Sequence, residues 1–418
     1  MGNMETDSLT RGWKRNLYVI WAAELVAIAG FSVAFPFLPY YVQELGVTGP
    51  GQVEMWSGLL FTTSAITMAI FAPLWGSLAD RYGRKLMVER AMFGGAVLIG
   101  AMGLVRNVQQ LAILRALQGC VTGTVPAAIT LVASSVPRRR SGYALGLLQM
   151  AIYSGASVGP LLGGLVADVF GYRAAFWVTA CLLFAAGLCV FFLVEERFAP
   201  SRQKEDPPAG GPGSSPVESF RQGLALVLRS RALLIMFGTR VVTNFGLRIM
   251  GPMLPLFVQS LMPGQGRAAS VTGLITGARA ATGALGAVAL GRVGDRVGYR
   301  QVLVACALGA AALYVPQFLV VTPTQLLILQ ATAGVATGGI MASVSATLAQ
   351  LAPEGRQGVV YGVDSSANSV ARAIAPMAGA AIATGLGLRF IFLCAAGIFA
   401  LAALGMMGLL VRTKESKP

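Results

Sequence analysis

Long apolar segments separated by short polar breaks run along the whole chain. An α-helix needs about 20 apolar residues to cross the hydrocarbon core of a bilayer. The pattern predicts twelve membrane-spanning helices, over 17–43, 54–78, 86–105, 108–131, 142–169, 173–194, 231–261, 268–290, 301–321, 324–350, 358–386 and 388–411. Segments of about 10 alternating residues, which would indicate a membrane β-barrel, are missing from this pattern.

One long polar segment divides the twelve predicted spans into two groups of six. Residues 195–230 are rich in Pro, Gly and Ser, a composition typical of a flexible linker. The end of this segment, from 217 to 228, has the pattern of a short amphipathic helix on the membrane surface. We therefore expect an N-terminal bundle over 1–194, a cytoplasmic linker over 195–230 and a C-terminal bundle over 231–418.

The two groups of spans repeat each other in sequence. Three pairs of segments match at an offset of 215 or 216 residues: FPFLPYYVQ (35–43) with GPMLPLFVQ (251–259), GSLADRYGRK (76–85) with GRVGDRVGYR (291–300), and QLAILRALQGCVTG (110–123) with QLLILQATAGVATG (325–338). Parallel repeats of this kind are related by an axis along the membrane normal. We predict an all-α membrane protein of two pseudo-symmetric six-helix bundles, with a substrate site at mid-depth between them.

Composition supports this class and excludes several others. Hydrophobic residues make up 55% of the chain and charged residues only 12%, which excludes a soluble enzyme, a disordered chain and a disulfide scaffold. The chain has no histidine, so a His-ligated metal site and His-based catalysis are excluded. The five cysteines lie in apolar segments and are interpreted as packing residues. We expect no metal, no cofactor and no enzymatic activity.

The net charge of +15 is interpreted as a topology signal. Most of the 32 lysines and arginines fall in loops on one side, and only Arg106, Arg173, Arg267 and Arg389 fall in loops on the other. Basic residues concentrate in cytoplasmic loops. We expect an inner (plasma) membrane protein with both termini in the cytoplasm, and the basic run at 138–140 needs no nucleic-acid partner.

Three motifs together resemble the major facilitator superfamily, and within it the twelve-span drug:proton antiporters. GSLADRYGRK (76–85) matches the signature loop of the superfamily. LAILRALQG (111–119), with Arg115, matches its Arg-bearing fourth span, although Val121 replaces an expected glycine. GASVGPLLGG (155–164) is similar to the fifth-span pattern of antiporters. The resemblance covers nearly the whole chain and implies the major facilitator fold and multidrug export.

Two of these motifs also have a direct physical interpretation. An Asp at the membrane surface can cap a neighbouring helix and pair with an Arg, and such a latch closes one conformation. The expected gating residues are Asp80, Arg81, Gly83 and Arg84, with Asp295 and Arg296 in the second repeat. Glycines permit close contact between helices, and a proline bends a helix. The expected helix-packing residues are Gly155, Gly159, Pro160, Gly163 and Gly164.

Seven ionisable residues lie well inside the predicted spans: Glu24, Arg115, Arg240, Arg248, Arg279, Asp364 and Arg372. A charge at the bilayer centre costs about 2.5–3.5 kcal/mol on insertion scales, so these side chains must face a wet cavity or each other. Glu24 and Arg240 are equivalent positions in the two repeats, and we expect them to face the cavity from opposite sides at similar depth.

Glu24 is the preferred proton carrier, with Arg115 as its partner and Asp364 as a second coupling residue. A carboxyl whose surroundings change with access can bind and release a proton. Two alternatives stay open. Glu24 and Arg115 can instead form a fixed pair that only positions helices, and Asp364 can instead neutralise Arg372 or Arg279.

The expected substrate-binding residues form polar stripes on two spans. Arg240, Asn244 and Arg248 repeat every four residues on the seventh span, and Asp364, Asn368 and Arg372 do so on the eleventh. Arg279 is added from the eighth span. The seven buried groups carry more positive than negative charge, which favours anionic or zwitterionic amphiphiles as substrates, because guanidinium groups bind carboxylates and phosphates.

The sequence thus predicts a proton-coupled secondary transporter that exports amphiphilic small molecules by alternating access. It lacks an ATP-binding G-x-x-x-x-G-K-[ST] loop, so primary pumping is not expected. The alternative of the same fold is a proton-coupled importer or a lipid flippase. The expected partners are a small-molecule substrate, protons and the lipid bilayer, and the protein is expected to be a monomer.

Overall fold

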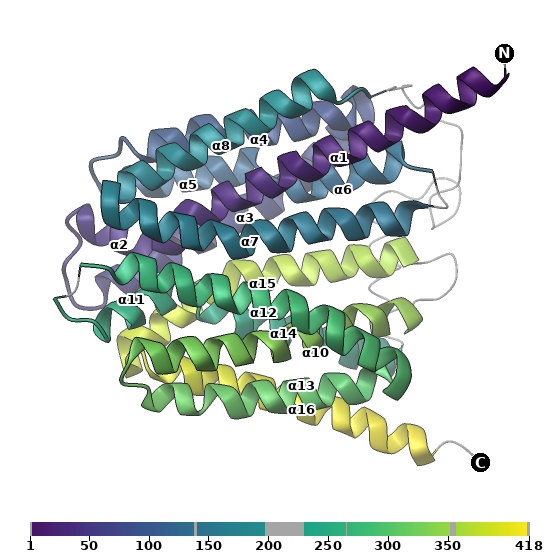
Figure 1. The fold of residues 1–418 in the computed structure, drawn as a ribbon. Helices are drawn as coiled ribbons and strands as arrows, with labels where there is room; N and C mark the ends of the chain where they lie inside the picture. The colour runs from purple at the N-terminus through teal and green to yellow at the C-terminus, as the bar shows by residue number, and fades with distance from the viewer. Residues whose placement is uncertain (1, 138–139, 197–229, 265, 352–356, 416–418) are drawn as a thin grey trace. The chain divides into compact units, whose positions relative to one another are not determined.

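The computed structural model describes residues 2–137, 140–196, 230–264, 266–351 and 357–415, and this part of the chain is helical without strands. The first half contains α1 (Gly2–Ala34), η1 (Phe35–Phe37), α2 (Leu38–Glu44), α3 (Gln52–Tyr82), α4 (Arg84–Met102), α5 (Val108–Val121), α6 (Thr124–Ser135), α7 (Ser141–Phe170) and α8 (Tyr172–Leu193) (Figure 1). The second half contains α10 (Arg231–Ile249), α11 (Met253–Ser260), α12 (Ala268–Val297), α13 (Tyr299–Tyr314), η3 (Pro316–Leu319), α14 (Pro323–Leu351), α15 (Gln357–Leu386) and α16 (Phe390–Glu415).

Helices occupy all twelve positions at which the apolar pattern predicts a span. Ten described helices or helix runs are long and apolar enough to cross a membrane, and α10 with α11 passes as a pair bent by about 40°. The remaining position is α4, which begins with three basic residues and one acidic residue in its first seven. The fold class predicted from the sequence is therefore confirmed. The amphipathic helix predicted over 217–228 lies outside the described residues.

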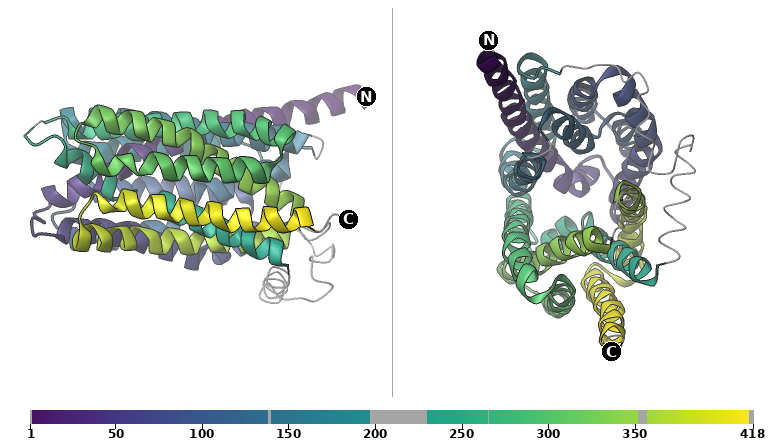
Figure 2. Two further views of the ribbon diagram at one scale, coloured as in Figure 1. Left: turned by 90° about the horizontal axis from the view of Figure 1, so that it is seen from below. Right: turned by 90° about the vertical axis from the view of Figure 1, so that its right-hand side faces the viewer.

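The chain divides into two compact units. The first contains α1 to α8 together with the beginning of α12, through Gly277. The second contains α10, α11, the rest of α12 from Ala278, and α13 to α16. Figure 2 shows the helices of each unit from the side and end-on.

The same helix pairings occur in both units. In the first unit α1 packs on α7 and α8, and α4 packs on α8. In the second unit α10 packs on α15 and α16, and α13 packs on α16. An aromatic contact recurs at the same offset as the sequence repeat: the Tyr41 and Phe176 rings lie 4.9 Å apart, and so do those of Phe257 and Phe392. The sequence repeat therefore corresponds to a repeat of the packing within each unit.

The predicted span over 108–131 is one of those that are divided in the structure. The single helix predicted over 108–131 is instead α5 followed by α6, with a break at Thr122 and Gly123. Gly123 has φ of +141°, which side-chain-bearing residues rarely adopt. Pro126, in the first turn of α6, also has no backbone N–H to donate to the preceding helix. The break brings Thr124, at the start of α6, into the buried interior of the first unit.

Candidate functional site

Glu24 lies in the middle of α1 and is completely buried. Neither of its carboxylate oxygens has a hydrogen-bond partner among the described residues. The Thr124 hydroxyl lies near enough to interact with the carboxyl, but its geometry falls short of a hydrogen bond. An ionised carboxylate in such surroundings is costly, and binding a proton removes the charge. The surroundings of Glu24 are those of a proton-binding group.

The positive charge of Arg115, on α5, is stabilised by polar groups and aromatic rings. Its Nε donates to the carbonyl oxygen of Leu60 at 3.2 Å, and its Nη1 donates to Oε1 of Gln118 at 2.6 Å. The guanidinium carbon lies 4.5 Å from the centre of the Phe35 ring and 5.4 Å from that of Phe61. In the described part of the chain, neither an ion pair nor a hydrogen bond joins Arg115 to Glu24.

In the second unit, Arg240 on α10 forms an ion pair with Asp364 on α15. Arg240 Nε lies 3.3 Å from Asp364 Oδ1, and both side chains are largely buried. Ser345 on α14 accepts a hydrogen bond from Arg240 Nη1 at 3.3 Å, and Asn368 donates to Asp364 Oδ2 at 3.3 Å. Asn244 donates to the carbonyl oxygen of Arg240, on its own helix. The partner of Asp364 is thus Arg240, which differs from both alternatives considered for Asp364 from the sequence.

Two further arginines lie two helical turns along from this ion pair. Arg248 follows Arg240 on α10, and Arg372 follows Asp364 on α15. The two guanidinium groups are close enough for their charges to repel each other. Within the described ranges no acidic side chain lies at ion-pair distance from either one. Because α10 and α15 pack along each other, this part of the second unit has an excess of positive charge suited to an anion.

Among the further polar groups of the second unit is Arg279, on α12. It lies beside Tyr314, which is completely buried. Gln330 on α14 donates to Oε1 of Gln317 at 2.9 Å, and both glutamines are completely buried. Gln330 is the counterpart of Arg115 in the sequence repeat, so a polar side chain occupies this position in both repeats.

The signature loop joins α3 to α4 at Gly83, which has φ of +101°. The side chain of Asp80, the expected latch residue, lies outside the described residues. Arg81 stacks over the neighbouring Tyr82 ring, and Arg84 donates to the carbonyl oxygen of Thr130 at 3.4 Å. In the second repeat, Asp295 accepts a hydrogen bond from the Tyr299 hydroxyl, and Arg296 lies in the last turn of α12.

The N-terminus of α4 is capped by Glu196. Its two carboxylate oxygens accept from the backbone N–H groups of Arg84 and Lys85, at 3.0 and 2.8 Å. A carboxylate at a helix N-terminus satisfies free donors and interacts favourably with the helix dipole. Glu196 falls in the predicted linker, and the sequence pattern does not indicate a cap there; only the fold reveals it.

Four glycines of α7, Gly155, Gly159, Gly163 and Gly164, lie where other backbones approach this helix closely. A Cβ atom on Gly155 would lie 2.8 Å from the carbonyl oxygen of Leu25, and Gly159 and Gly163 face α1 in the same way one and two turns later. Gly164 instead faces the start of α12 at Ala269, within the first unit. Pro160 lies inside α7 among these contacts.

The same part of the first unit is joined by polar contacts. Asp168, in the last turn of α7, accepts from the backbone N–H of Ser270 at 2.8 Å. The hydroxyl groups of Tyr40 and Thr272 lie 2.9 Å apart. The glycines and these bonds together hold the start of α12 against α7.

The family model described as the Major Facilitator Superfamily matches residues 20–264 and 236–418. The Multidrug resistance protein MdtG of Salmonella arizonae is 36% identical over 94% of this chain and 95% of that protein. A bacterial homolog of the human lysosomal transporter Spinster has a similar fold, with a TM-score of 0.75 at 14% identity over 94% of this chain and 96% of that one. A mutant of the nucleoside transporter NupG gives a TM-score of 0.74 at 13% identity over 93% of this chain and 99% of that one.

A glycine pair on α7 tests the contact between α7 and α1. Gly163→Ala places a methyl group against the Val33 backbone, whereas the matched control Gly146→Ala, on the same helix, meets nothing within 4 Å. Overpacking of this kind costs about 1–3 kcal/mol. We expect Gly163→Ala to lower the thermal unfolding temperature of the purified protein by several degrees and Gly146→Ala to leave it unchanged. Equal unfolding temperatures for the two variants would contradict the packing described here.

Proposed function

Because the chain belongs to the Major Facilitator Superfamily, we propose that it is a proton-coupled exporter of amphiphilic small molecules that works by alternating access between its two bundles. Family membership makes it a multi-pass membrane transporter rather than an enzyme. The proposal of drug export rests on the 36% identity to MdtG, a multidrug resistance protein, over nearly the full length of both chains. The proposal places the protein in the inner membrane as a monomer, with both termini in the cytoplasm.

The observation that supports proton coupling is the buried carboxyl of Glu24 without a hydrogen-bond partner among the described residues. A group of this kind is stable in a dry environment when it holds a proton, and it releases the proton when water reaches it. Alternating access supplies this change of environment in every cycle. One proton moving inward across about 150 mV releases about 3.5 kcal/mol, which sustains a substrate gradient of about 300-fold.

The arginines of the second unit support a preference for anionic or zwitterionic substrates. Arg248 and Arg372 have neighbouring guanidinium groups without a described acidic partner, and a carboxylate or phosphate group would relieve their repulsion. The membrane potential also favours export of an anion. Exchange of one monoanion for one proton moves two elementary charges, which corresponds to about 7 kcal/mol across about 150 mV.

Asp364 would compete with such a substrate for Arg240. While Asp364 is ionised, it occupies the Nε edge of the Arg240 guanidinium, and a substrate anion near this pair would be repelled. The ion pair therefore limits anion binding at Arg240 and leaves Arg248 and Arg372 as the stronger attraction. In this proposal, Arg279, Asn244 and Asn368 are further polar residues of the substrate site.

Replacement of Glu24 tests proton coupling. Glu24→Gln keeps the shape and the neutral form of the side chain, so we expect normal folding but loss of proton-driven export from proteoliposomes with an imposed potential of about 150 mV, with the gradient of about 300-fold falling to near unity. The matched control Glu44→Gln removes an exposed acid of the same unit and should keep full export. Pumping that persists in Glu24→Gln would exclude Glu24 as the proton carrier. If the wild-type protein instead moves substrate inward under an inward proton gradient, it is an importer.

Charge variants of the second unit test the substrate class, using a fluorescent carboxylate and its methyl ester as probes. We expect Arg248→Gln and Arg372→Gln each to weaken binding of the carboxylate about tenfold, because a hydrogen bond to a charged group contributes about 1.5–3 kcal/mol. Binding of the ester by these variants should stay unchanged. The control Arg106→Gln, at a residue in an exposed loop, should bind both probes as the wild type does.

The variant Asp364→Asn should have the opposite effect. It removes the competing charge from Arg240, so we expect tighter carboxylate binding in the same assay. If all of these variants bind the carboxylate as the wild type does, the anion preference is wrong.

A further inference from the structure

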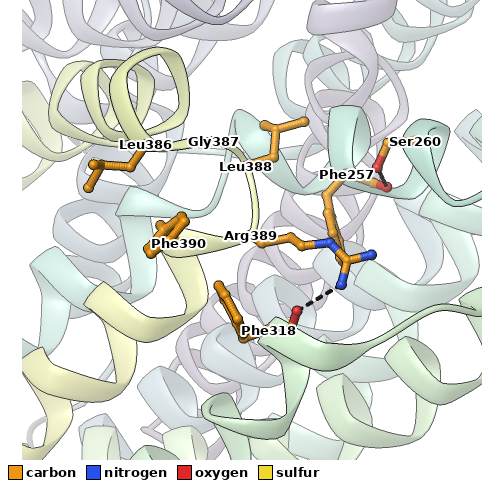
Figure 3. A pocket seen from close by; sticks show the side chains of 8 residues that line it. All are labelled: Phe257, Ser260, Phe318, Leu386, Gly387, Leu388, Arg389 and Phe390. Atoms are coloured by element: carbon orange, nitrogen blue, oxygen red, sulfur yellow. Dashed lines mark hydrogen bonds between the residues drawn. The ribbon is translucent and has the colours of Figure 1, made fainter.

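The second unit has a pocket of about 280 Å³ where α16 begins, at the end of the unit opposite the last turn of α16 (Figures 1 and 3). Residues from three places form it: the end of α11, η3, and the turn between α15 and α16. Its lining consists of Phe257, Ser260, Phe318, Leu386, Gly387, Leu388, Arg389 and Phe390. Arg389 is therefore the only charged residue in a lining that is otherwise almost entirely apolar.

At the equivalent position in the first unit, an arginine is paired with an acid. Arg173 lies 216 residues before Arg389 in the repeat. Its Nε lies 3.3 Å from Oε1 of Glu44, and its Nη2 donates to the carbonyl oxygen of Val105 at 3.2 Å. The residue that corresponds to Glu44 in the second unit is Ser260. The repeat therefore keeps the arginine but has lost its acid.

Two further replacements leave space beside the arginine. Tyr41, whose hydroxyl donates to the carbonyl oxygen of Met102 at 2.9 Å, corresponds to Phe257. Tyr172 corresponds to the smaller Leu388. The second unit thus lacks a carboxylate, a hydroxyl group and an aromatic ring that are present at this end of the first unit. The pocket lies at the place where these groups are missing.

Arg389 keeps donors available for an external acceptor. Its Nη1 donates to the carbonyl oxygen of Phe318 at 2.9 Å, and its guanidinium carbon lies 5.8 Å from the centre of the Phe257 ring. A guanidinium group has five N–H donors, and in the described parts of the chain no carboxylate pairs with Arg389. The side chain is exposed, so an anion can approach it.

The surface around the pocket is apolar. Leu319 of η3 is 70% exposed, Val321 is 63% exposed and Leu386, at the end of α15, is 61% exposed. In a chain of spanning helices, exposed apolar residues of this kind contact lipid chains. An arginine at the border of such a surface lies at the level of the lipid headgroups.

We propose that this pocket binds the phosphate group of a membrane phospholipid, with Arg389 as the anion contact and Leu319, Val321 and Leu386 beside the acyl chains. The size of the pocket, the lost carboxylate and the apolar border favour a lipid over a soluble anion. A bound headgroup would replace Glu44 of the first unit as the counter-charge, and it would join α11, η3 and the α15–α16 turn. The pocket shares no lining residue with the proposed coupling and anion-binding groups, so the proposal does not depend on the proposed transport function.

The test measures binding of phosphatidylglycerol to the purified full-length protein by native mass spectrometry, with thermal unfolding as a second measurement. We expect Arg389→Gln to reduce the affinity for one lipid molecule about tenfold, because it removes a charged hydrogen-bond partner. Ser260→Glu introduces into the second unit the acid that Glu44 provides in the first. It should also weaken lipid binding, although Arg389 is still present. The matched control Arg173→Gln, whose arginine is already paired with Glu44, should bind lipid as the wild type does.

The two lipid-defective variants protect the test against a folding artefact. Ser260→Glu adds a partner for Arg389, so loss of lipid binding in a variant that unfolds at the wild-type temperature or above supports the site. Unchanged lipid binding in both Arg389→Gln and Ser260→Glu would overturn the proposal. Inorganic phosphate that stabilises the wild type as strongly as phosphatidylglycerol would overturn the assignment to lipid.

Discussion

A charge inside a membrane-spanning bundle must be stabilised by its immediate surroundings, and the structure depends on how each charged side chain within the spans meets this requirement. Arg115 is surrounded by a carbonyl group, an amide and two aromatic rings. Arg240 and Asp364 neutralise each other. Glu24, by contrast, has no hydrogen-bond partner among the described residues, and Arg248 and Arg372 repel each other. Groups that the fold leaves unsatisfied are those for which a proton or a substrate can supply the missing interaction.

The two units have matching helix pairings but different charges at equivalent positions. Glu24 corresponds to Arg240, Arg115 corresponds to Gln330, and Glu44 corresponds to Ser260. Packing that is determined by the backbone, such as the aromatic contact of Tyr41 with Phe176 and that of Phe257 with Phe392, is retained in both. The repeat thus supplies the scaffold, and the departures from the repeat supply each unit with its own chemistry. Glu24 of the proposed coupling site and Arg240 of the proposed anion site occupy equivalent positions and are one such departure.

Close packing and breaks in the helices determine where these groups can be placed. Glycines allow α7 to approach both α1 and the start of α12 at backbone distance. The break at Gly123 places Thr124 beside the carboxyl of Glu24. A continuous helix would have continued its hydrogen bonds through this position. The positions of polar groups in the interior thus depend on local backbone geometry as much as on residue type.

The sequence alone determined the number and order of the spans, the two-fold repeat and the set of ionisable residues inside the spans. It did so because a bilayer requires about 20 apolar residues per helix and because the repeat can be aligned directly. Only the tertiary structure decided which groups meet. Asp364 pairs with Arg240 on another helix rather than with Arg372, which lies eight residues along its own helix, about 12 Å away at 1.5 Å per residue. The cap by Glu196 and the break at Gly123 likewise follow from how the helices rotate and pack, which the apolar pattern does not specify.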